Sequence, residues 1–253
     1  MVRPLAIVPT YNERDNLLLL IPALLALQPP VDVLVVDDNS PDGTGQIAEA
    51  MAARDERVRV LHRAGKQGLG SAYIAGFQSA LALGYDCVIQ MDADLSHRPE
   101  DLPRLLQALD HADVVIGSRK VPGGKVLGWS AARRFISRGG SLYARWLLGL
   151  PINDCTSGFK CLRRRALEAI DLAGVRSNGY GFLVELNYLW ARAGLRIVEV
   201  PIVFPNRTRG ASKMSAAIAL EAAVVLWQLR FRGGLTTEEI VEAAPALSSR
   251  GGV

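Results

Sequence analysis

Two aspartates one residue apart, Asp92 and Asp94, are the residues of this chain with the clearest capacity for chemistry. They directly follow the apolar run 87–91, which is typical of a buried strand that ends before them. In open α/β sheets, ligands bind at the carboxyl ends of the strands. Two carboxylates this close repel each other unless a cation lies between them, and hard oxygen ligands suit Mg²⁺ or Mn²⁺. An ordinary solvated turn is the alternative interpretation of an isolated Asp-x-Asp.

Polar residues also follow the first strand-like run of the chain. Residues 7–13 read IVPTYNE, so Tyr11 and Glu13 come just after Pro9. Proline stiffens the turn, while Tyr and Glu side chains can stack on or hydrogen-bond a base or ribose. The same stretch also fits a simple strand-to-helix turn in which Asn12 caps a helix.

The second strand-like run ends in paired acids. Residues 35–44 read VVDDNSPDGT, and Asp38 is placed to accept hydrogen bonds from sugar hydroxyls or from a base N–H. The stretch also has the chemistry of a plain turn closed by Asp42 and Gly43. Both interpretations can hold if the turn, closed by Asp42 and Gly43, orients the Asp38 side chain toward the ligand.

The elements that must position these residues alternate along the first half of the chain. This alternation predicts an α/β fold with a mostly parallel sheet and helices on both faces. Strands are expected at 5–8, 31–36, 58–61, 88–91 and 114–117, and helices near 13–27, 43–54, 68–83 and 100–110. The second half predicts a helix near 183–193, a strand near 195–203 and an apolar helix at 213–231. No G-x-G-x-x-G follows the first strand, which disfavours a dinucleotide-binding fold.

Composition narrows the class of protein further. With 253 residues, 49% of them hydrophobic, the chain can form one large α/β domain. The net charge of +4 favours an anionic partner. Three cysteines make no paired framework, which suggests a reducing compartment. No signal peptide precedes the first strand, and the leucine-rich run 17–27 is too short to span a bilayer.

A basic, aromatic segment occupies the middle of the chain. Residues 114–153 contain no acid, and within them the segment 125–148 predicts an amphipathic helix at a membrane interface, split in two at Gly139 and Gly140. A solvated basic face over core aromatics is the alternative. Nucleic acid is disfavoured, because no nucleic-acid-binding fold signature is present. The helix at 213–231 fits docking onto the fold and a second interfacial element equally well.

The three strand-end stretches, in this order and spacing, resemble the family 2 glycosyltransferases of GT-A fold. Residues 63–77 (RAGKQGLGSAYIAGF), 117–119 (GSR), 157–159 (Ser-Gly-Phe) and 207–214 (RTRGASKM) look like those of dolichol- or polyprenol-phosphate mannose synthases. The resemblance covers about residues 5–215. It implies a catalytic domain at 1–232 and leaves 233–253 as a weakly ordered tail.

The resemblance implies roles for individual residues. The nucleotide sugar would be bound by Pro9, Tyr11, Glu13, Val36, Asp38, Asp92, Ala93, Asp94, Arg119, Arg207 and Lys213. Asp92 and Asp94 would bind the metal. The catalytic group would be Asp94, Arg119, Arg207 and Lys213, and the acceptor phosphate would contact Arg119, Arg133 and Ser137. Ser96 stands where some relatives carry a glutamine that adds a metal ligand, and it is left out of the metal site. The three histidines show no metal-like spacing and receive no role.

The function implied is inverting transfer of mannose from GDP-mannose to polyprenyl (dolichyl) phosphate, with Mg²⁺ or Mn²⁺ as cofactor. The enzyme would work at the cytoplasmic face of a membrane with an anionic surface, alone or with a membrane-anchoring partner. Two alternatives stay open. One is another family 2 transferase, such as a polyprenyl-phosphate glucosyltransferase. The other is a catalytically silent membrane-docking subunit.

Overall fold

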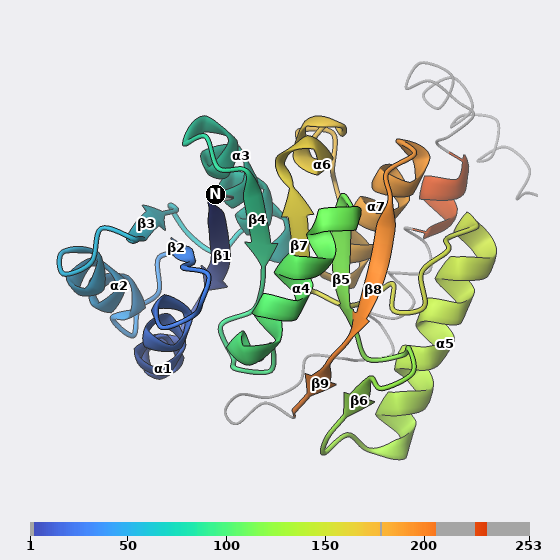
Figure 1. Ribbon diagram of the computed structural model, residues 1–253, viewed down its shortest axis with the longest axis horizontal. Coiled ribbons are helices and arrows are strands. Elements are labelled where there is room, and N and C mark those ends of the chain that lie inside the picture. Colours follow the sequence, from blue (N-terminus) through green and yellow to red (C-terminus); the bar gives the residue numbers. More distant parts are fainter. Residues whose placement is uncertain (1–2, 178, 206–225, 232–253) are drawn as a thin grey trace, which may run out of the picture.

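The computed structural model describes residues 3–177, 179–205 and 226–231 (Figure 1). Within that part of the chain, the main sheet has the strand order β3-β2-β1-β4-β7-β5-β8, and β6 pairs with β9 in a second, two-stranded sheet. Neighbouring strands of the main sheet are parallel, except that β7 runs antiparallel to both β4 and β5. The expected α/β architecture with a mostly parallel sheet is confirmed.

The first-half elements lie close to their predicted bounds. The strands are β1 (Pro4–Thr10), β2 (Asp32–Asp37), β3 (Val58–His62), β4 (Cys87–Gln90), β5 (Val114–Ser118), β6 (Lys125–Val126), β7 (Lys160–Arg163), β8 (Ile197–Pro201) and β9 (Val203–Phe204). The helices are α1 (Arg14–Leu25), α2 (Thr44–Ala52), α3 (Leu69–Ala82), α4 (Leu102–Ala108), α5 (Ala131–Leu148), α6 (Arg164–Glu168) and α7 (Gly179–Arg192), with short 3₁₀ turns η1 (Pro99–Asp101) and η2 (Leu109–His111).

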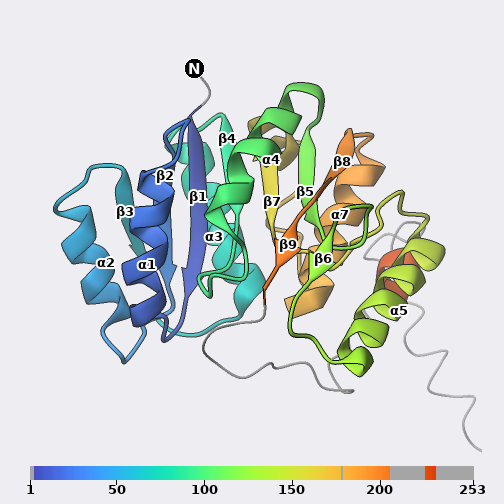
Figure 2. The same cartoon turned by 60° about the horizontal axis from the view of Figure 1, so that its bottom comes forward.

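Helices cover both faces of the main sheet (Figure 2). In β2, Val33 and Val35 face the core formed with α1, α2 and α4, whereas Leu34 and Val36 face the core formed with α3, α6 and α7. Successive strand residues point to opposite faces, so a strand that is covered on both sides is apolar throughout. This explains why the strand-like runs of the sequence are continuous rather than alternating.

Strand β7 was not predicted, and it matters for the site. Only its two middle residues, Cys161 and Leu162, are apolar, and charged residues flank them, so the sequence shows no strand-like apolar run there. The strand inserts between β4 and β5, where Lys160 pairs with Gln90, the last residue of β4. The turn just before β7, residues 157–159, is thereby brought beside the end of β4.

The start of α1 differs from the prediction that Asn12 caps it. Asn12 has a φ of 62°, and the residue that precedes the helix is Glu13, with no side-chain capping bond. Instead, the backbone N–H groups of Asn12 and Glu13 donate to the side chains of Ser40 and Thr44, at 3.1 and 3.0 Å. Ser40 and Thr44 thus fix the backbone just before α1, and the Asp42 side chain accepts the first-turn N–H of Arg14 at 3.3 Å.

Helix α5 is continuous, so the predicted split at Gly139 and Gly140 is wrong. A side-chain carbon at either glycine would meet no heavy atom within 4 Å, which places both on an open side of the helix. The helix begins at a proper cap, because the Ser130 side chain accepts a hydrogen bond from the Arg133 N–H. It ends at Gly149, whose φ of 66° suits glycine. Two glycines in an 18-residue helix weaken it without breaking it.

The end of the chain is described only at residues 226–231, which are helical. Leu226 and Leu229 are buried in the same core cluster as Leu147 of α5, and this segment lies next to α5 in Figures 1 and 2. The rest of the expected helix at 213–231 and the tail at 233–253 lie outside the described residues. No helix in the described ranges has the length and apolar character to cross a bilayer. All three cysteines are described, and each is buried and free of disulfide bonds.

Candidate active site

The carboxyl ends of the parallel strands gather the candidate residues at one edge of the sheet. β1 pairs in register with β2 and β4, so Pro9 lies opposite Val36 and Ile7 lies opposite Gln90. The arrowheads of β1, β4 and β8 point to the same side in Figure 1. Tyr11 lies in the loop after β1, Asp38 directly follows β2, and the Asp-x-Asp pair lies in the loop after β4.

Two neighbouring aspartates at the end of β2, Asp37 and Asp38, have different partners. Asp37 anchors the turn: it accepts bonds from the Thr10 hydroxyl at 3.0 Å and from the Ser40 hydroxyl and N–H at 2.6 and 3.0 Å. Asp38 accepts a 2.6 Å bond from Nη1 of Arg63, and both of these side chains are nearly buried. Burial raises the pKa of Asp38, although Arg63 opposes that effect. Arg63 therefore orients Asp38, and the sequence analysis gave this arginine no site role.

Tyr11 and Glu13 sit at the open part of this edge. The Tyr11 side chain is exposed, and Nζ of Lys66 lies 4.1 Å from its ring centroid. Glu13 accepts a 2.6 Å bond from the Asn16 side chain. An exposed ring under a cation is suited to stack against a nucleobase.

Two side chains, Tyr73 and Ser96, hold the Asp-x-Asp pair. The Tyr73 hydroxyl of α3 donates to Oδ1 of Asp92 at 3.1 Å. Burial, then the charge of Asp92, raises the pKa of Tyr73 well above its usual value, so the hydroxyl stays a donor. Oδ1 of Asp94 accepts both the N–H and the hydroxyl of Ser96, at 3.1 and 2.5 Å. Ser96 thus orients a carboxylate here.

The donor set at the end of β4 fits a divalent cation that also binds substrate. Two carboxylates one residue apart supply hard oxygen ligands. In the described part of the chain, no group of three or more His, Cys, Asp or Glu side chains is placed to hold a metal. Mg²⁺ and Mn²⁺ sites of this kind are completed by water and substrate phosphates. The backbone at Gly158 also comes close, since a side-chain carbon there would lie 3.8 Å from the Asp92 carboxylate oxygens.

Arg119, just after β5, makes a buried ion pair with Asp154, which lies 35 residues away in the sequence. Its Nε and Nη2 donate to the two oxygens of Asp154 at 2.7 and 2.8 Å, and Nη2 also donates to the Thr156 hydroxyl at 3.1 Å. Burial works against ionisation of Asp154, but Arg119 and Lys120 together hold its pKa well below the usual range. A planar, bidentate pair of this kind fixes the guanidinium group.

Asp154 is itself held from the other side by β8. Glu199 accepts the N–H groups of Asn153 and Asp154 at 2.7 and 2.9 Å, and it accepts the Asn153 side-chain amide at 2.8 Å. Arg145 of α5 donates to the Asn153 side chain at 2.8 Å. The position of Arg119 therefore depends on β8 and α5.

The residues expected at the acceptor phosphate lie near Arg119. The guanidinium carbons of Arg133 and Arg119 lie 4.1 and 5.4 Å from the ring centroid of Trp129. Nζ of Lys120 donates to the Ser137 carbonyl at 2.7 Å, and the same nitrogen lies 3.3 Å from Oδ1 of Asp154. The structure thus brings Arg119, Arg133 and Ser137 into one neighbourhood.

Lys160 is a further buried cation near this neighbourhood. It is fully buried and donates to the Ser157 carbonyl at 2.8 Å. Burial lowers its pKa to about 7. The sequence shows only that a lysine follows the Ser-Gly-Phe turn. It does not show that this lysine is buried. Arg207 and Lys213 lie outside the described residues, so their roles stay predictions.

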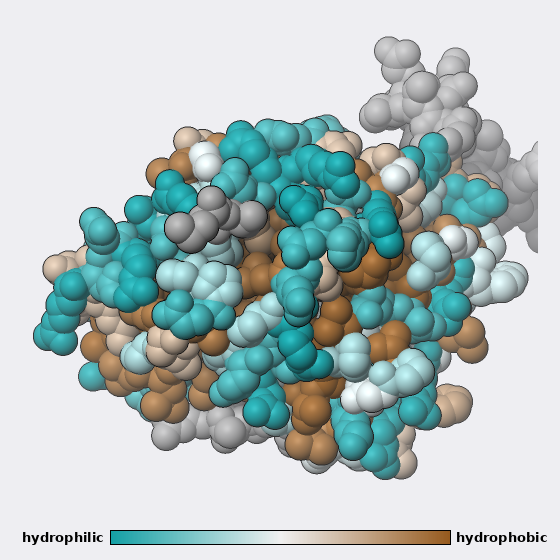
Figure 3. Space-filling model, in the orientation of Figure 1, coloured by the Kyte–Doolittle hydropathy of each residue, from teal (hydrophilic) through white to brown (hydrophobic). Residues whose placement is uncertain are grey.

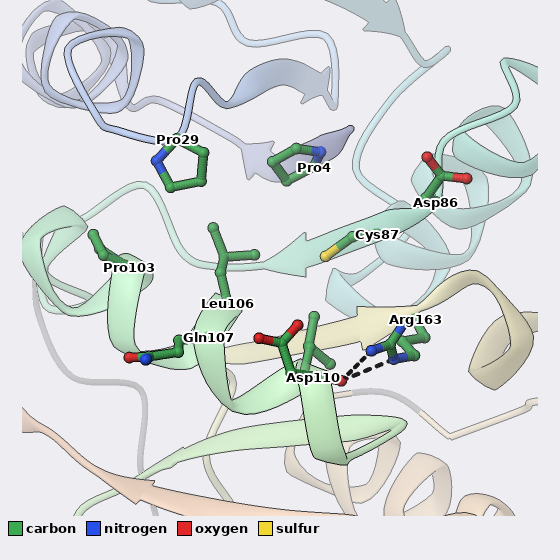
Figure 4. Close-up of a pocket in the computed structure, with 10 residues that line it drawn as sticks. Pro4, Pro29, Asp86, Cys87, Pro103, Leu106, Gln107, Asp110 and Arg163 are labelled. Atoms are coloured by element: carbon green, nitrogen blue, oxygen red, sulfur yellow. Dashed lines mark hydrogen bonds between the residues drawn. The ribbon is translucent and has the colours of Figure 1, made fainter. Parts of the chain in front are cut away.

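A cavity of about 330 Å³ lies away from this edge, at the amino ends of β1 and β4 (Figure 4). Pro4, Asp86 and Cys87 line it together with residues of α4 and η2. Arg163 borders it and donates to the Leu109 carbonyl at 2.9 Å. Because the carboxylates and arginines described above lie at the other end of the strands, this cavity is not part of the candidate site.

This sheet, with carboxylates after β4 and a basic group after β5, has the GT-A-type fold of glycosyltransferases. Solved structures of glucosyl-3-phosphoglycerate synthase from Mycobacterium tuberculosis share it. One, in complex with Mn²⁺, UDP-glucose and phosphoglyceric acid, has a TM-score of 0.69 at 21% identity over 93% of this chain and 81% of that chain. Another, with phosphoglyceric acid, has a TM-score of 0.68 at 20% identity over 93% of this chain and 82% of that chain.

Residues 5–171 match the model of glycosyl transferase family 2, and the chain belongs to that family. It is a glycosyltransferase. It is 55% identical over 223 residues to an undecaprenyl-phosphate mannosyltransferase of Micrococcus luteus, covering 88% of this chain and 92% of that protein. It is 49% identical over 234 residues to a polyprenol monophosphomannose synthase of Mycolicibacterium smegmatis, covering 91% of this chain and 88% of that protein. The resemblance stated from the motifs is confirmed.

Proposed function

We propose that this protein transfers mannose from GDP-mannose to the phosphate of a polyprenol, with inversion at the sugar carbon. The observation that carries the proposal is the single edge that collects Asp38, the Asp92–Asp94 pair and the Arg119–Arg133 neighbourhood. The names of the relatives in Micrococcus luteus and Mycolicibacterium smegmatis support mannose and a polyprenyl phosphate. GDP as the nucleotide rests on the motif resemblance.

On this proposal, Tyr11, Glu13 and Asp38 bind the nucleoside. Tyr11 offers an exposed ring for stacking, and Asp38, fixed by Arg63, accepts hydrogen bonds. Asp92 and Asp94 hold a divalent cation, Mg²⁺ or Mn²⁺, which neutralises charge on the leaving diphosphate when it is bound. Ser96 and Tyr73 orient the two carboxylates for that task.

Arg119 and Arg133 orient the acceptor phosphate beside the sugar. A phosphomonoester carries about two negative charges near neutral pH, with a second pKa of about 6, so its oxygen attacks without a strong base. The work of the protein is then positioning and stabilisation of developing charge. Arg207 and Lys213 are proposed to add positive charge at the diphosphate.

A decisive test is transfer of labelled mannose from GDP-mannose to a short polyprenyl phosphate, with EDTA and with Mg²⁺ or Mn²⁺ added back. We expect turnover that EDTA stops and either metal restores. Preference for labelled UDP-glucose would instead assign a glucosyltransferase. No turnover with any donor, from a protein that still binds liposomes, would favour a silent docking subunit.

We further propose that α5 rests on an anionic membrane surface. Phe135, Leu142 and Trp146 are 79%, 66% and 75% exposed, although each is large and apolar. Arg134 and Arg138 are exposed on the same helix. Apolar and polar residues lie side by side over α5 in Figure 3. A helix with exposed aromatic and basic side chains suits the interface of a bilayer that contains anionic lipid.

Residues 226–231 extend this surface. Trp227 and Phe231 are exposed and stack at 5.3 Å between ring centroids, while Leu226 and Leu229 of the same segment are buried against the fold. The segment therefore both docks on the fold and offers aromatic side chains outward. We place the enzyme peripherally at the cytoplasmic face of the membrane. Liposome flotation of the isolated chain tests whether an anchoring partner is needed.

A further inference from the structure

His97 lies at the end of the loop that carries the two aspartates, and it is 2% exposed. Its Nδ1 accepts a 2.9 Å hydrogen bond from the backbone N–H of Asp92. An imidazole nitrogen that accepts a hydrogen bond carries no proton, so the ring proton of a neutral His97 is on Nε2. The chain thereby closes the loop 92–97 with a bond between its first and last residues.

The His97 ring is fixed by packing on two sides. It stacks on Phe159 with centroids 4.8 Å apart and planes inclined by 10°, and it meets the edge of Phe204 at 5.6 Å. Phe159 belongs to the Ser-Gly-Phe turn, and Phe204 ends β9. A side-chain carbon at Gly158 would come within 3.4 Å of the ring, so the turn lies directly against it.

The loop that His97 closes is strained between its ends. Leu95 has a φ of 61°, a left-handed backbone conformation that a leucine rarely adopts. Ser96 bonds back to Asp94, and Tyr73 bonds to Asp92. A strained loop of this kind keeps its shape only while surrounding contacts hold it.

We propose that His97 is a positioning residue for the metal-binding carboxylates, with Nδ1 holding the Asp92 amide and so the orientation of the loop. This inference rests on the proposed function, because it assumes that Asp92 and Asp94 bind a divalent cation. The ring is buried between Phe159 and Phe204 and bonds the backbone of the loop, so its proposed role is to position the carboxylates rather than to react. Partners that orient the ligands of a metal commonly change affinity or activity by about 10- to 100-fold when they are lost.

The first test needs no metal. The chain has three histidines, His62, His97 and His111, so ¹⁵N-histidine labelling gives few signals, and a His97→Asn sample assigns the one of interest. We expect the neutral Nε2–H tautomer at pH 7.5. An Nδ1–H tautomer or an imidazolium would overturn the proposal whatever the metal site does.

The second test compares His97→Asn with His97→Gln. Both lose the ring and its stacking, but the asparagine oxygen can replace Nδ1 as an acceptor, whereas the longer glutamine places its oxygen nearer Nε2. We expect His97→Gln to weaken Mn²⁺ binding, measured by electron paramagnetic resonance with GDP present, by about 10-fold or more, and His97→Asn to stay within about threefold of wild type. Equal affinities in two folded variants would show that the ring only fills space.

Asp94→Ala separates this inference from the proposed function. If Asp94→Ala loses Mn²⁺ binding while both His97 variants keep it, the metal assignment stands and the role of His97 is wrong. If Asp94→Ala binds Mn²⁺ as wild type does, the metal assignment fails, and the role of His97 fails with it. Circular dichroism and the melting temperature check that each variant is folded.

Discussion

The two halves of the active-site edge are built by different means. The half that we propose binds the donor, called the donor half, consists of Tyr11, Asp38, Asp92 and Asp94, which follow β1, β2 and β4 within a few residues of each strand end. The half that we propose binds the acceptor, called the acceptor half, consists of Arg119, Arg133, Ser137 and Asp154, which come from the segment after β5, from α5 and from the loop before β7. In the donor half, strand ends bring the side chains to one edge, and single contacts such as that of Arg63 with Asp38 orient them. In the acceptor half, a chain of buried charged contacts does so.

This difference in how the side chains are held predicts how a substitution in each half affects stability and activity. A carboxylate at a strand end contributes little to the core, so its removal is expected to cost function rather than stability. The Arg119–Asp154 pair is nearly buried, with 8% and 0% of the two side chains exposed. Breaking a buried pair leaves an uncompensated charge, so in the acceptor half stability and function are coupled.

The largest expected effect is in the donor half. Asp94→Ala removes a proposed metal ligand and should abolish transfer while the melting temperature changes little, because Asp94 lies at the candidate site rather than in the apolar core. Transfer of labelled mannose at ordinary Mg²⁺ concentration measures it. Asp110→Ala, which removes an acid at the opposite edge of the sheet, is the matched control. Near-wild-type turnover of Asp94→Ala would refute the metal site.

Asp154→Asn should show the contrasting behaviour of the acceptor half. Losing one partner of a buried ion pair costs about 3–5 kcal/mol. The pKa of Asp154 is lowered on folding, so its stabilisation is fully present above its unfolded pKa of about 3.9 and is lost progressively as pH falls from that value through the much lower folded pKa. The gap in unfolding free energy between wild type and variant should therefore narrow at acid pH. Urea unfolding at pH 7 and pH 3.5 measures it, and a constant gap would contradict the ion pair.

Lys213→Ala extends the comparison to a lysine that lies outside the described residues. If Lys213 contacts the diphosphate in the transition state, its loss costs about 2–4 kcal/mol, or about 10²–10³-fold in turnover. The same change should leave the melting temperature unaffected, in contrast to Asp154→Asn. Steady-state kinetics for both substrates test this. Unchanged kcat and KM would remove Lys213 from the site, and Lys125→Ala is a suitable control because Lys125 is an exposed lysine on β6.

The smallest effect is expected at the outer face of α5. Each basic side chain near an anionic surface contributes about 1 kcal/mol, and salt screens that contribution. Reversing Arg134 and Arg138 to glutamate should weaken flotation with anionic liposomes and slow transfer to a long-chain acceptor. A short, water-soluble acceptor should be affected less.

Salt dependence gives a second measure of that surface. Wild-type binding should fall with added salt but keep a salt-resistant part from Phe135, Leu142 and Trp146, because the hydrophobic contribution is not screened. If the protein fails to float at low salt with anionic lipid, α5 is a solvated face and membrane access comes from another segment or from a partner.

Much of the donor half was predictable from the sequence. Apolar runs that end in Asp38 or in the Asp92–Asp94 pair predict strands with acids at their carboxyl ends, and parallel strands bring those ends to one edge. The register of β1 with β2 and β4 agrees with this expectation. An apolar run followed by acids carries this information because it depends only on neighbours along the chain.

Local reasoning failed where a contact from elsewhere decided the outcome. Asn12 looked like the cap of α1. In the structure, Ser40 and Thr44, which follow β2, accept hydrogen bonds from the backbone N–H groups of Asn12 and Glu13 and hold them outside the helix. Gly139 and Gly140 looked like a break in α5, but packing of residues such as Ala144 and Leu147 against the core sustains the helix. Tertiary packing outweighs a propensity cost of about 1 kcal/mol per glycine.

The sequence by itself determined the family, most of the sheet and the acids of the donor half, because apolar runs and short motifs are local properties. The tertiary structure alone decided the partners of the site. Arg119 and Asp154 are 35 residues apart, and Asp38 and Arg63 are 25 apart. Insertion of β7 beside β4 brings Phe159 against His97, which no spacing rule foresees. Burial gives these polar contacts their strength, and burial exists only once the chain has folded.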